Sequence, residues 1–309
     1  MSSALPALYG SVYTIDGLNF GGAPGADGVE LVLSALTGWD GSAPPVTQHV
    51  QRPGSSGEFD LPVQAGARAI GGTGWLWVPT SLSLNAGITL RRQYEDKLAA
   101  MCGGNSLHIF LDTREDGTTR QAYVRLDAVT EVQVDSGNPY ASDFTFQLSA
   151  ADHRKYGAVV TSVVTLPTSS GGLDFATGGG LNFSPGLNFG TAGTSGTAPV
   201  SNPGTADTYP VITFSAAGGS VTNPVVTDTS TGKQLAFTGL TLSGTDQLVI
   251  TQNPTLRSVL LNGTGDRRGS MSVANWITIA AGATDTLQFG ASASTGTPTM
   301  TVAVAPAYR

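Results

Sequence analysis

Short runs in which apolar and polar residues alternate predict β-strands through most of the chain. In the first half the expected strands are 8–14, 29–36, 68–78, 107–112, 120–126, 131–135 and 144–149. Because side chains of a strand point alternately to its two faces, Trp75 and Trp77 must lie on the same face of segment 68–78.

One segment has helical spacing instead. Its apolar positions recur every three or four residues, at Leu90, Tyr94, Leu98, Met101 and Cys102. Gly103–Gly104 is typical of a helix C-terminus, whereas Gly87 weakens any start near Asn85. Residues 1–167 are therefore expected to form an α+β block of mostly antiparallel strands with a single helix.

The last third of the chain has short apolar runs every eight to twelve residues, separated by turn residues. The expected strands are 211–214, 225–227, 234–237, 248–251, 259–261, 276–279, 286–289 and 300–305. This spacing predicts an antiparallel β-sandwich over residues 204–309. The whole chain is thus expected to be mainly β.

Between the two blocks, residues 168–203 are rich in Gly, Ser, Thr, Pro and Ala, as a linker is. The segment repeats a Gly-Leu-x-Phe unit, at Gly172–Phe175, Gly180–Phe183 and Gly186–Phe189. An exposed Phe is unfavourable by about 1.5–3 kcal/mol relative to a buried one, which favours a strap lying along a domain over a free tether. Proteolysis within 168–201 is expected to separate two stable pieces.

The net charge and its distribution along the chain limit the classes of partner that the protein is expected to bind. The 309 residues carry a net charge of −7, and residues 204–309 hold five acidic and five basic side chains, so the acidic excess lies in the first two thirds. Such a block repels phosphate, which argues against a protein that grips nucleic acid. No secretory signal and no run of roughly 20 apolar residues is found, so we expect assembly in the cytoplasm without membrane insertion.

The sequence offers little catalytic chemistry. Its three histidines are His49, His108 and His153, all far apart in sequence, and no Gly-x-Ser-x-Gly elbow accompanies the pair Asp152–His153. Segment 112–123 resembles a calcium loop but has Arg114 at a ligand position. The single cysteine, Cys102, is interpreted as a buried, inert thiol. We expect no enzyme and no catalytic, cofactor or metal site.

A sugar-binding role for the second block is the alternative hypothesis. Residues 204–309 contain no His, no Glu and one Trp, Trp276, placed in an expected core strand. That leaves few of the polar side chains and stacking faces that a galactoside site uses, so we expect no useful galactoside binding. A hydrolase would need a catalytic constellation that the sequence lacks.

Two stretches, Ser149–Gly157 and Asn202–Phe214, resemble the distal tail protein family of long-tailed, siphovirus-type bacteriophages in their order and separation. Members often have Pro where this chain has His153. The resemblance extends to other collinear segments: Gly71–Pro79, Leu98–Cys102, Ile109–Asp112, Arg120–Leu126, Tyr209–Ile212, Asn223–Pro224, Leu248–Ile250, Val259–Gly263, Trp276 and Gly282–Phe289.

This resemblance implies a structural virion protein of the phage tail tip, assembled in the host cytoplasm. Residues 1–167 would be a β-barrel-like belt domain, 168–203 the interdomain strap and 204–309 a galectin-like sandwich. Six belts would close into a ring joining the tail tube and tape-measure proteins to the tail-tip hub or fibre protein. DNA would pass through the lumen without specific binding. Trp75 and Trp77 are the expected ring-interface residues. The alternative is a carbohydrate-binding adhesin of a phage tail.

Overall fold

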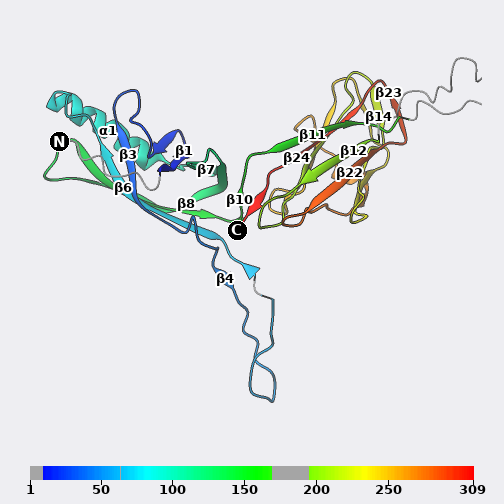
Figure 1. Cartoon of the computed structure of the whole chain (residues 1–309), viewed down its shortest axis with the longest axis horizontal. Helices are drawn as coiled ribbons and strands as arrows, with labels where there is room; N and C mark the ends of the chain where they lie inside the picture. The colour runs from blue at the N-terminus through cyan, green and yellow to red at the C-terminus, as the bar shows by residue number, and fades with distance from the viewer. Residues whose placement is uncertain (1–9, 63, 169–194) are drawn as a thin grey trace, which may run out of the picture. The chain divides into compact units, whose positions relative to one another are not determined.

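The computed structural model describes residues 10–62, 64–168 and 195–309, and is mainly β, as predicted. The Gly-Leu-x-Phe units lie outside the described residues. The chain divides into two compact units, Met1–Ala158 with Tyr308–Arg309, and Val159–Ala307 (Figure 1). Among the described residues, no helix is long and apolar enough to cross a membrane.

The first unit combines ten strands with a single described helix. In chain order they are β1 Val12–Ile15, β2 Leu18–Phe20, β3 Glu30–Thr37, β4 Pro45–Val46, β5 Gln64–Ala65, β6 Arg68–Trp77, α1 Leu84–Ala100, β7 His108–Thr113, β8 Thr119–Val134, β9 Ala141–Ala150 and β10 Lys155–Tyr156.

The main sheet of this unit is antiparallel, with the order β2-β1-β7-β8-β9-β6-β3. Strand β10 pairs with β8 and with β25, Ala307–Tyr308. The two end strands, β2 and β3, approach each other through the Gly21 N–H, which donates to the Leu31 carbonyl at 2.7 Å. They form no ladder, so within the described residues the expected barrel-like sheet is open rather than closed.

Strand β8 merges two expected strands. Segments 120–126 and 131–135 are parts of one 16-residue strand that pairs with β7 and then with β9. Its register against β9 shifts between Leu126 and Ala128 and again before Glu131. These irregularities break the strict alternation of apolar and polar residues, which is why the sequence pattern reads as two strands.

Helix α1 begins at Leu84, a start that the sequence pattern left open because of Gly87. It includes Gly87, where a Cβ atom would lie 2.4 Å from the ring of Tyr140, so glycine allows the helix and this ring to approach closely. The helix ends at Ala100, and Cys102 already has a positive φ of 55°. Burial, with Asp16 nearby, raises the pKa of the Cys102 thiol to about 12. Without a bound metal ion the thiol therefore stays protonated, which agrees with the expected inert thiol.

The core of the first unit centres on aromatic rings that cover glycines. Phe144 and Phe146 on β9 pair directly with Gly74 and Gly72 on β6, and both rings pack near Phe20. A Cβ at Gly72 would lie 2.2 Å from the Phe146 ring. The absence of side chains on β6 therefore makes room for the two rings, a cross-strand pairing that stabilises sheets.

The second unit is an antiparallel sandwich, as predicted. Its elements are β11 Val160–Thr165, β12 Thr197–Ser201, β13 Val211–Ser215, β14 Ser220–Thr222, β15 Val225–Asp228, β16 Gln234–Phe237, β17 Thr241–Ser243, β18 Gln247–Thr251, β19 Ser258–Leu261, β20 Gly265–Asp266, η2 Arg268–Ser270, β21 Met271–Ala274, β22 Thr284–Gly290, β23 Ala293–Thr295 and β24 Thr299–Val304.

Two large sheets enclose its core. One has the order β11-β24-β13-β18-β19-β20 and the other β12-β22-β15-β16-β21, with a smaller sheet β17-β14-β23 beside them. Phe214 of the first large sheet and Phe289 of the second approach with ring centroids 5.3 Å apart. Buried residues of both sheets belong to one apolar cluster.

The boundary between the units differs from the expected limits of 167 and 204. Strand β11 lies before residue 167 but pairs with β24 along its whole length, from Val160↔Val304 to Thr165↔Thr299. Strand β12 lies in the expected strap but pairs with β22. Both belong to the sandwich, since their partners come from the end of the chain, which local sequence patterns do not reveal.

Segment 276–279 was expected as a core strand, and this is wrong. The described strand here is β21, and Ile279 makes only an isolated bridge with Thr208. Ile277 and Ile279 are fully buried while Trp276 is half-buried, so the segment contributes to the core without joining a sheet.

This pairing changes the expected result of cleavage between Thr168 and Ser201. The N-terminal fragment would keep β11, a full strand of the larger sandwich sheet. We therefore predict that the two fragments stay together under native conditions and separate only in denaturant. Size-exclusion chromatography of the cleaved chain, with and without urea, is the measurement. Separate elution in native buffer would contradict the pairing.

Substitution Gly72→Ala should destabilise the first unit by about 1–3 kcal/mol, because the new methyl group must displace the packed Phe146 ring. Gly41→Ala is the matched control, since a Cβ there meets nothing within 4 Å and the backbone does not have positive φ. Urea unfolding followed by tryptophan fluorescence measures both. Equal stability of the two variants would rule out the proposed packing constraint.

Candidate functional site

A long hairpin arm projects from the first unit between β3 and β6. The arm comprises residues 42–66, of which 63 lies outside the described part, and Figure 1 shows it extending from the sheet at the label β4. Strands β4 and β5 pair near its base, and Gln51 bridges to Glu58 near its tip. Residues 44–62 are all exposed.

The arm has few contacts of its own but an apolar surface. His49 Nδ1 lies 2.7 Å from Glu58 Oε2, and the Arg52 guanidinium lies 5.7 Å from the centre of the Phe59 ring. Its exposed apolar side chains are Val46 at 49%, Val50 at 45%, Phe59 at 48% and Leu61 at 37%. Several exposed apolar side chains on one projecting hairpin make it a candidate for a surface that another protein covers.

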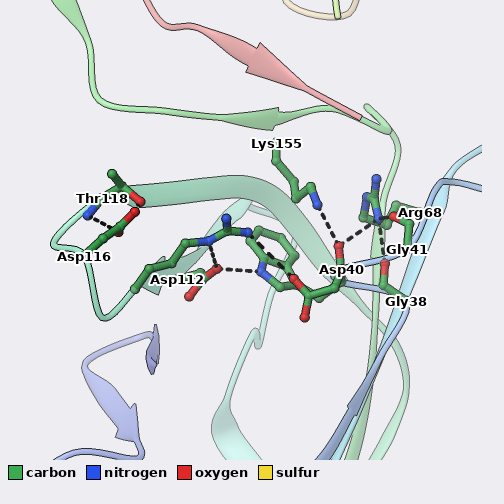
Figure 2. A network of polar contacts seen from close by, with 10 residues as sticks. Gly38, Asp40, Gly41, Arg68, Asp112, Asp116, Thr118 and Lys155 are labelled. Atoms are coloured by element: carbon green, nitrogen blue, oxygen red, sulfur yellow. Dashed lines mark hydrogen bonds and ion pairs between the residues drawn. The ribbon is translucent and has the colours of Figure 1, made fainter. Parts of the chain in front are cut away.

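Arg68 fixes the base of this arm. It is the first residue of β6, directly after the arm, and only 1% of it is exposed. Its Nη1 donates to the carbonyls of Gly38 at 2.7 Å, Trp39 at 3.1 Å and Gly41 at 2.7 Å. Figure 2 shows this guanidinium beside the glycine carbonyls. One buried cation thus binds three carbonyls of the backbone segment that leads into the arm.

A second buried cation lies beside the first. Lys155 on β10 is 2% exposed, and its Nζ donates to the Trp39 carbonyl at 2.9 Å and lies 5.5 Å from the centre of the Trp39 ring. Burial lowers the pKa of Lys155 to about 8, and repulsion from Arg68 adds to this effect. Burial also lowers the pKa of Arg68.

The Trp39 side chain joins this base to the hairpin β7–β8. Its indole Nε1 donates to Asp112 Oδ2 at 2.9 Å, and Arg114 Nε donates to the same oxygen at 3.1 Å. Asp116 then accepts hydrogen bonds from the Thr118 N–H and hydroxyl (Figure 2). The segment that resembles a calcium loop is a hairpin whose Asp112 is a structural acceptor, a role that the sequence pattern does not reveal.

The two tryptophans of β6 lie on one face, as alternation requires, and that face is the outer one. Trp77 is 38% exposed and Trp75 is half-buried, whereas Leu76 between them is fully buried. Strand β6 is paired on both sides, with β9 and β3, so these side chains can contact a partner only through the sheet face. Trp75 lies opposite Asp143 on β9.

The residues considered in the sequence for catalysis and for sugar stacking make structural contacts in the fold. Asp152 accepts a hydrogen bond from the Tyr156 hydroxyl at 2.6 Å, and the His153 carbonyl accepts one from Arg68 Nε at 3.1 Å. In the second unit, the Arg257 guanidinium lies 4.4 Å from the centre of the Trp276 ring. That cation occupies one face of the only tryptophan in residues 204–309.

The lowered pKa of Lys155 predicts how the stability of the folded chain depends on pH. Between pH 8 and 10.5 the unfolded chain binds a proton at this side chain more tightly than the folded chain, so unfolding takes up a proton and rising pH favours the folded state. The stability of the native chain relative to Lys155→Met should therefore rise by about 1–3 kcal/mol across this range. Urea unfolding at several pH values measures it, with Lys97→Met on the exposed helix face as control. A constant difference would contradict the lowered pKa of Lys155.

Comparisons with known proteins place this geometry in context. Residues 203–307 match the family model described as the C-terminal domain of the siphovirus-type tail component. No curated protein sequence matches the chain.

Among solved structures, the crystal structure of Dit from phage SPP1, described as a paradigm of the hub adsorption apparatus in phages infecting Gram-positive bacteria, matches with a TM-score of 0.59 and 16% identity. The match covers 97% of this chain and 99% of that one. Two baseplate structures of phage P2, in activated conformations with Ca and Sr, match with TM-scores of 0.48 and 0.45 and identities of 10% and 9%, covering 95% and 94% of this chain and 97% of each of those chains.

The family match and the likeness to SPP1 Dit are both to proteins of the phage tail and its adsorption apparatus. The resemblance inferred from the sequence is thereby confirmed. Residues 203–307 match the model of the siphovirus-type tail component C-terminal domain, and the chain as a whole shares the fold of the distal tail protein Dit of phage SPP1.

Proposed function

We propose that this chain is the distal tail ring protein of a siphovirus-type phage, with six copies closing through their first units. The ring would connect the tail tube and tape-measure proteins to the tail-tip hub or fibre protein, and the second unit, a galectin-like sandwich, would lie outside the ring. The role is structural and not enzymatic.

One observation carries this proposal. The family match covers the second unit, while the fold likeness to SPP1 Dit spans nearly the full length of both chains. A chain that merely borrowed a tail-type sandwich as a sugar-binding module would need no counterpart of the first unit. The shared pair of units therefore favours a ring component over a free-standing adhesin.

The arm is the strongest candidate for the contact between neighbouring copies. Burying an apolar side chain of this size contributes about 1.5–3 kcal/mol, and the arm exposes several. Arg68 and Lys155 hold the backbone carbonyls at Gly38, Trp39 and Gly41, so the base from which the arm extends is positioned before docking. The face of Trp75 and Trp77 is the second candidate, since both lie on the outer side of the sheet.

Charge is compatible with a ring through which DNA passes. The outer face of the sheet exposes Glu30 on β3, Glu131 on β8 and Asp143 on β9, around the two tryptophans. Carboxylates do not hold phosphate, whereas Lys and Arg do. An acidic first unit would therefore keep DNA from adhering to the wall of a lumen.

The ring proposal predicts an assembly that depends on concentration. Phe59→Ser with Leu61→Ser should weaken it at least tenfold, because the exposed apolar surface of the arm is removed without touching the core. Sedimentation velocity over a range of concentrations, with negative-stain images, is the measurement.

Two further variants serve as comparisons. Leu256→Ser changes a similarly exposed leucine of the second unit and should leave assembly unchanged. Trp77→Ser tests the sheet face; a loss of assembly in this variant but not in the arm variant would move the contact from the arm to the face. A native chain that stays monomeric at every concentration, with the tail tube protein present, would refute the ring.

A further inference from the structure

Three side chains of different ligand chemistry converge in the first unit, away from the arm. Asp16, Cys102 and His108 each offer one ligand atom, and these atoms all lie within 4.8 Å of one another. In sequence they are separated by up to 92 residues. The fold alone brings a carboxylate, a thiol and an imidazole together.

Each of the three is positioned by a different element. Asp16 and Gly17, with φ angles of 49° and 78°, form the two-residue turn between β1 and β2, as a type I′ hairpin requires. Cys102 follows the C-terminus of α1, and His108 is the first residue of β7. Strand β7 pairs with β1, which brings His108 near the turn.

The carboxylate of Asp16 orients the other two residues. Its Oδ1 lies 2.7 Å from His108 Nδ1, and its Oδ2 accepts the Cys102 backbone N–H at 2.7 Å. The second ring nitrogen of His108, Nε2, lies 3.3 Å from the hydroxyl of Ser106. A histidine with one nitrogen directed into a cluster and the other held by a hydrogen-bonding partner has the arrangement of a metal-ligating histidine.

The exposure of the cluster is suited to a bound ion. Cys102 is buried, while the side chains of His108 and Asp16 are 15% and 31% exposed. Asp16 also lines a cavity of about 560 Å³ together with Asn19 and Lys97. The cluster is therefore closed on the sulfur side and reachable from the carboxylate side.

The combination of donors selects the class of ion. Magnesium and calcium take oxygen ligands, whereas zinc and similar ions take imidazole nitrogen, thiolate sulfur and carboxylate oxygen together. In a tetrahedral zinc site, ligand bonds of about 2.0–2.3 Å place the donors roughly 3.5 Å apart. The widest separation here, at most 4.8 Å, would shorten by about 1 Å, and the Asp16–His108 contact of 2.7 Å would open by a similar amount as the ion replaces that hydrogen bond.

We propose that Asp16, Cys102 and His108 form a binding site for a divalent cation of the zinc type, with water as the fourth ligand. Such an ion would link the β1–β2 turn, the end of α1 and the start of β7, and so brace the first unit. This site goes beyond the proposed tail function and does not depend on it.

Cobalt and zinc are the probes for the test. The full-length chain is treated with a chelator, dialysed, and titrated with Co²⁺ while the visible and near-ultraviolet absorption is recorded. We expect one equivalent to bind, with a sulfur-to-cobalt charge-transfer band, and Zn²⁺ to displace it. The melting temperature should rise with added Zn²⁺, because a ligand that binds the folded state stabilises it.

Variants decide whether the cluster is the site. Cys102→Ala should abolish the charge-transfer band, and Asp16→Asn, which keeps the size of the side chain, should weaken Zn²⁺ binding at least tenfold. His49→Gln is the matched control, since His49 and Glu58 form the other histidine–carboxylate pair at 2.7 Å but have no thiol in the described structure nearby.

Circular dichroism first establishes that each variant is folded; if Cys102→Ala is not, Asp16→Asn decides. No thiolate band in the native chain, unchanged Zn²⁺ affinity in Asp16→Asn, or an equal loss in His49→Gln would overturn the proposal.

Discussion

The first unit depends on a buried guanidinium whose hydrogen-bond partners are backbone carbonyls. Arg68 binds carbonyls from residues 38, 39, 41 and 153, and Lys155 adds a second cation at the same place. Burying two like charges is unfavourable, and each donor that finds a carbonyl offsets part of that cost. Because those carbonyls lie where the chain leaves the sheet, the cations determine where the arm begins, and with it the surface that we propose for assembly.

Local pattern predicted the parts of the fold that depend on neighbouring residues. Strand β16 has the expected bounds, and the sandwich follows from evenly spaced strands. What failed depends on distant residues or on irregular pairing. Gly87 fits inside the helix because it leaves room for the ring of Tyr140, and β11 belongs to the sandwich because β24 pairs with it; both partners are far away in sequence. Strands β8 and β9 are adjacent along the chain, but two register shifts interrupt the alternation that would mark β8 as one strand.

The candidate surfaces were predicted only in part. Alternation places Trp75 and Trp77 on one face, but that β6 is an inner strand follows from its pairing with both β9 and β3. The arm is rich in Gly, Pro and Ser and looks like an ordinary loop in the sequence; its signal was the set of apolar residues between them, such as Phe59 and Leu61. Asp16, Cys102 and His108 are brought together by a helix end, a turn and a strand start, which spacing alone cannot reveal.

The end of the chain gives the second unit a particular mechanical character. Strand β25 pairs with β10, and the Tyr308 ring lies 3.5 Å beneath the Arg120 guanidinium, so the last residues return to the first unit. The sandwich is therefore an insertion with two covalent attachments rather than a module on a single tether. A pulling force on it would be shared between the two segments that lead into it, one ending at Ala158 and the other beginning at Tyr308, whereas a single tether would bear the whole load.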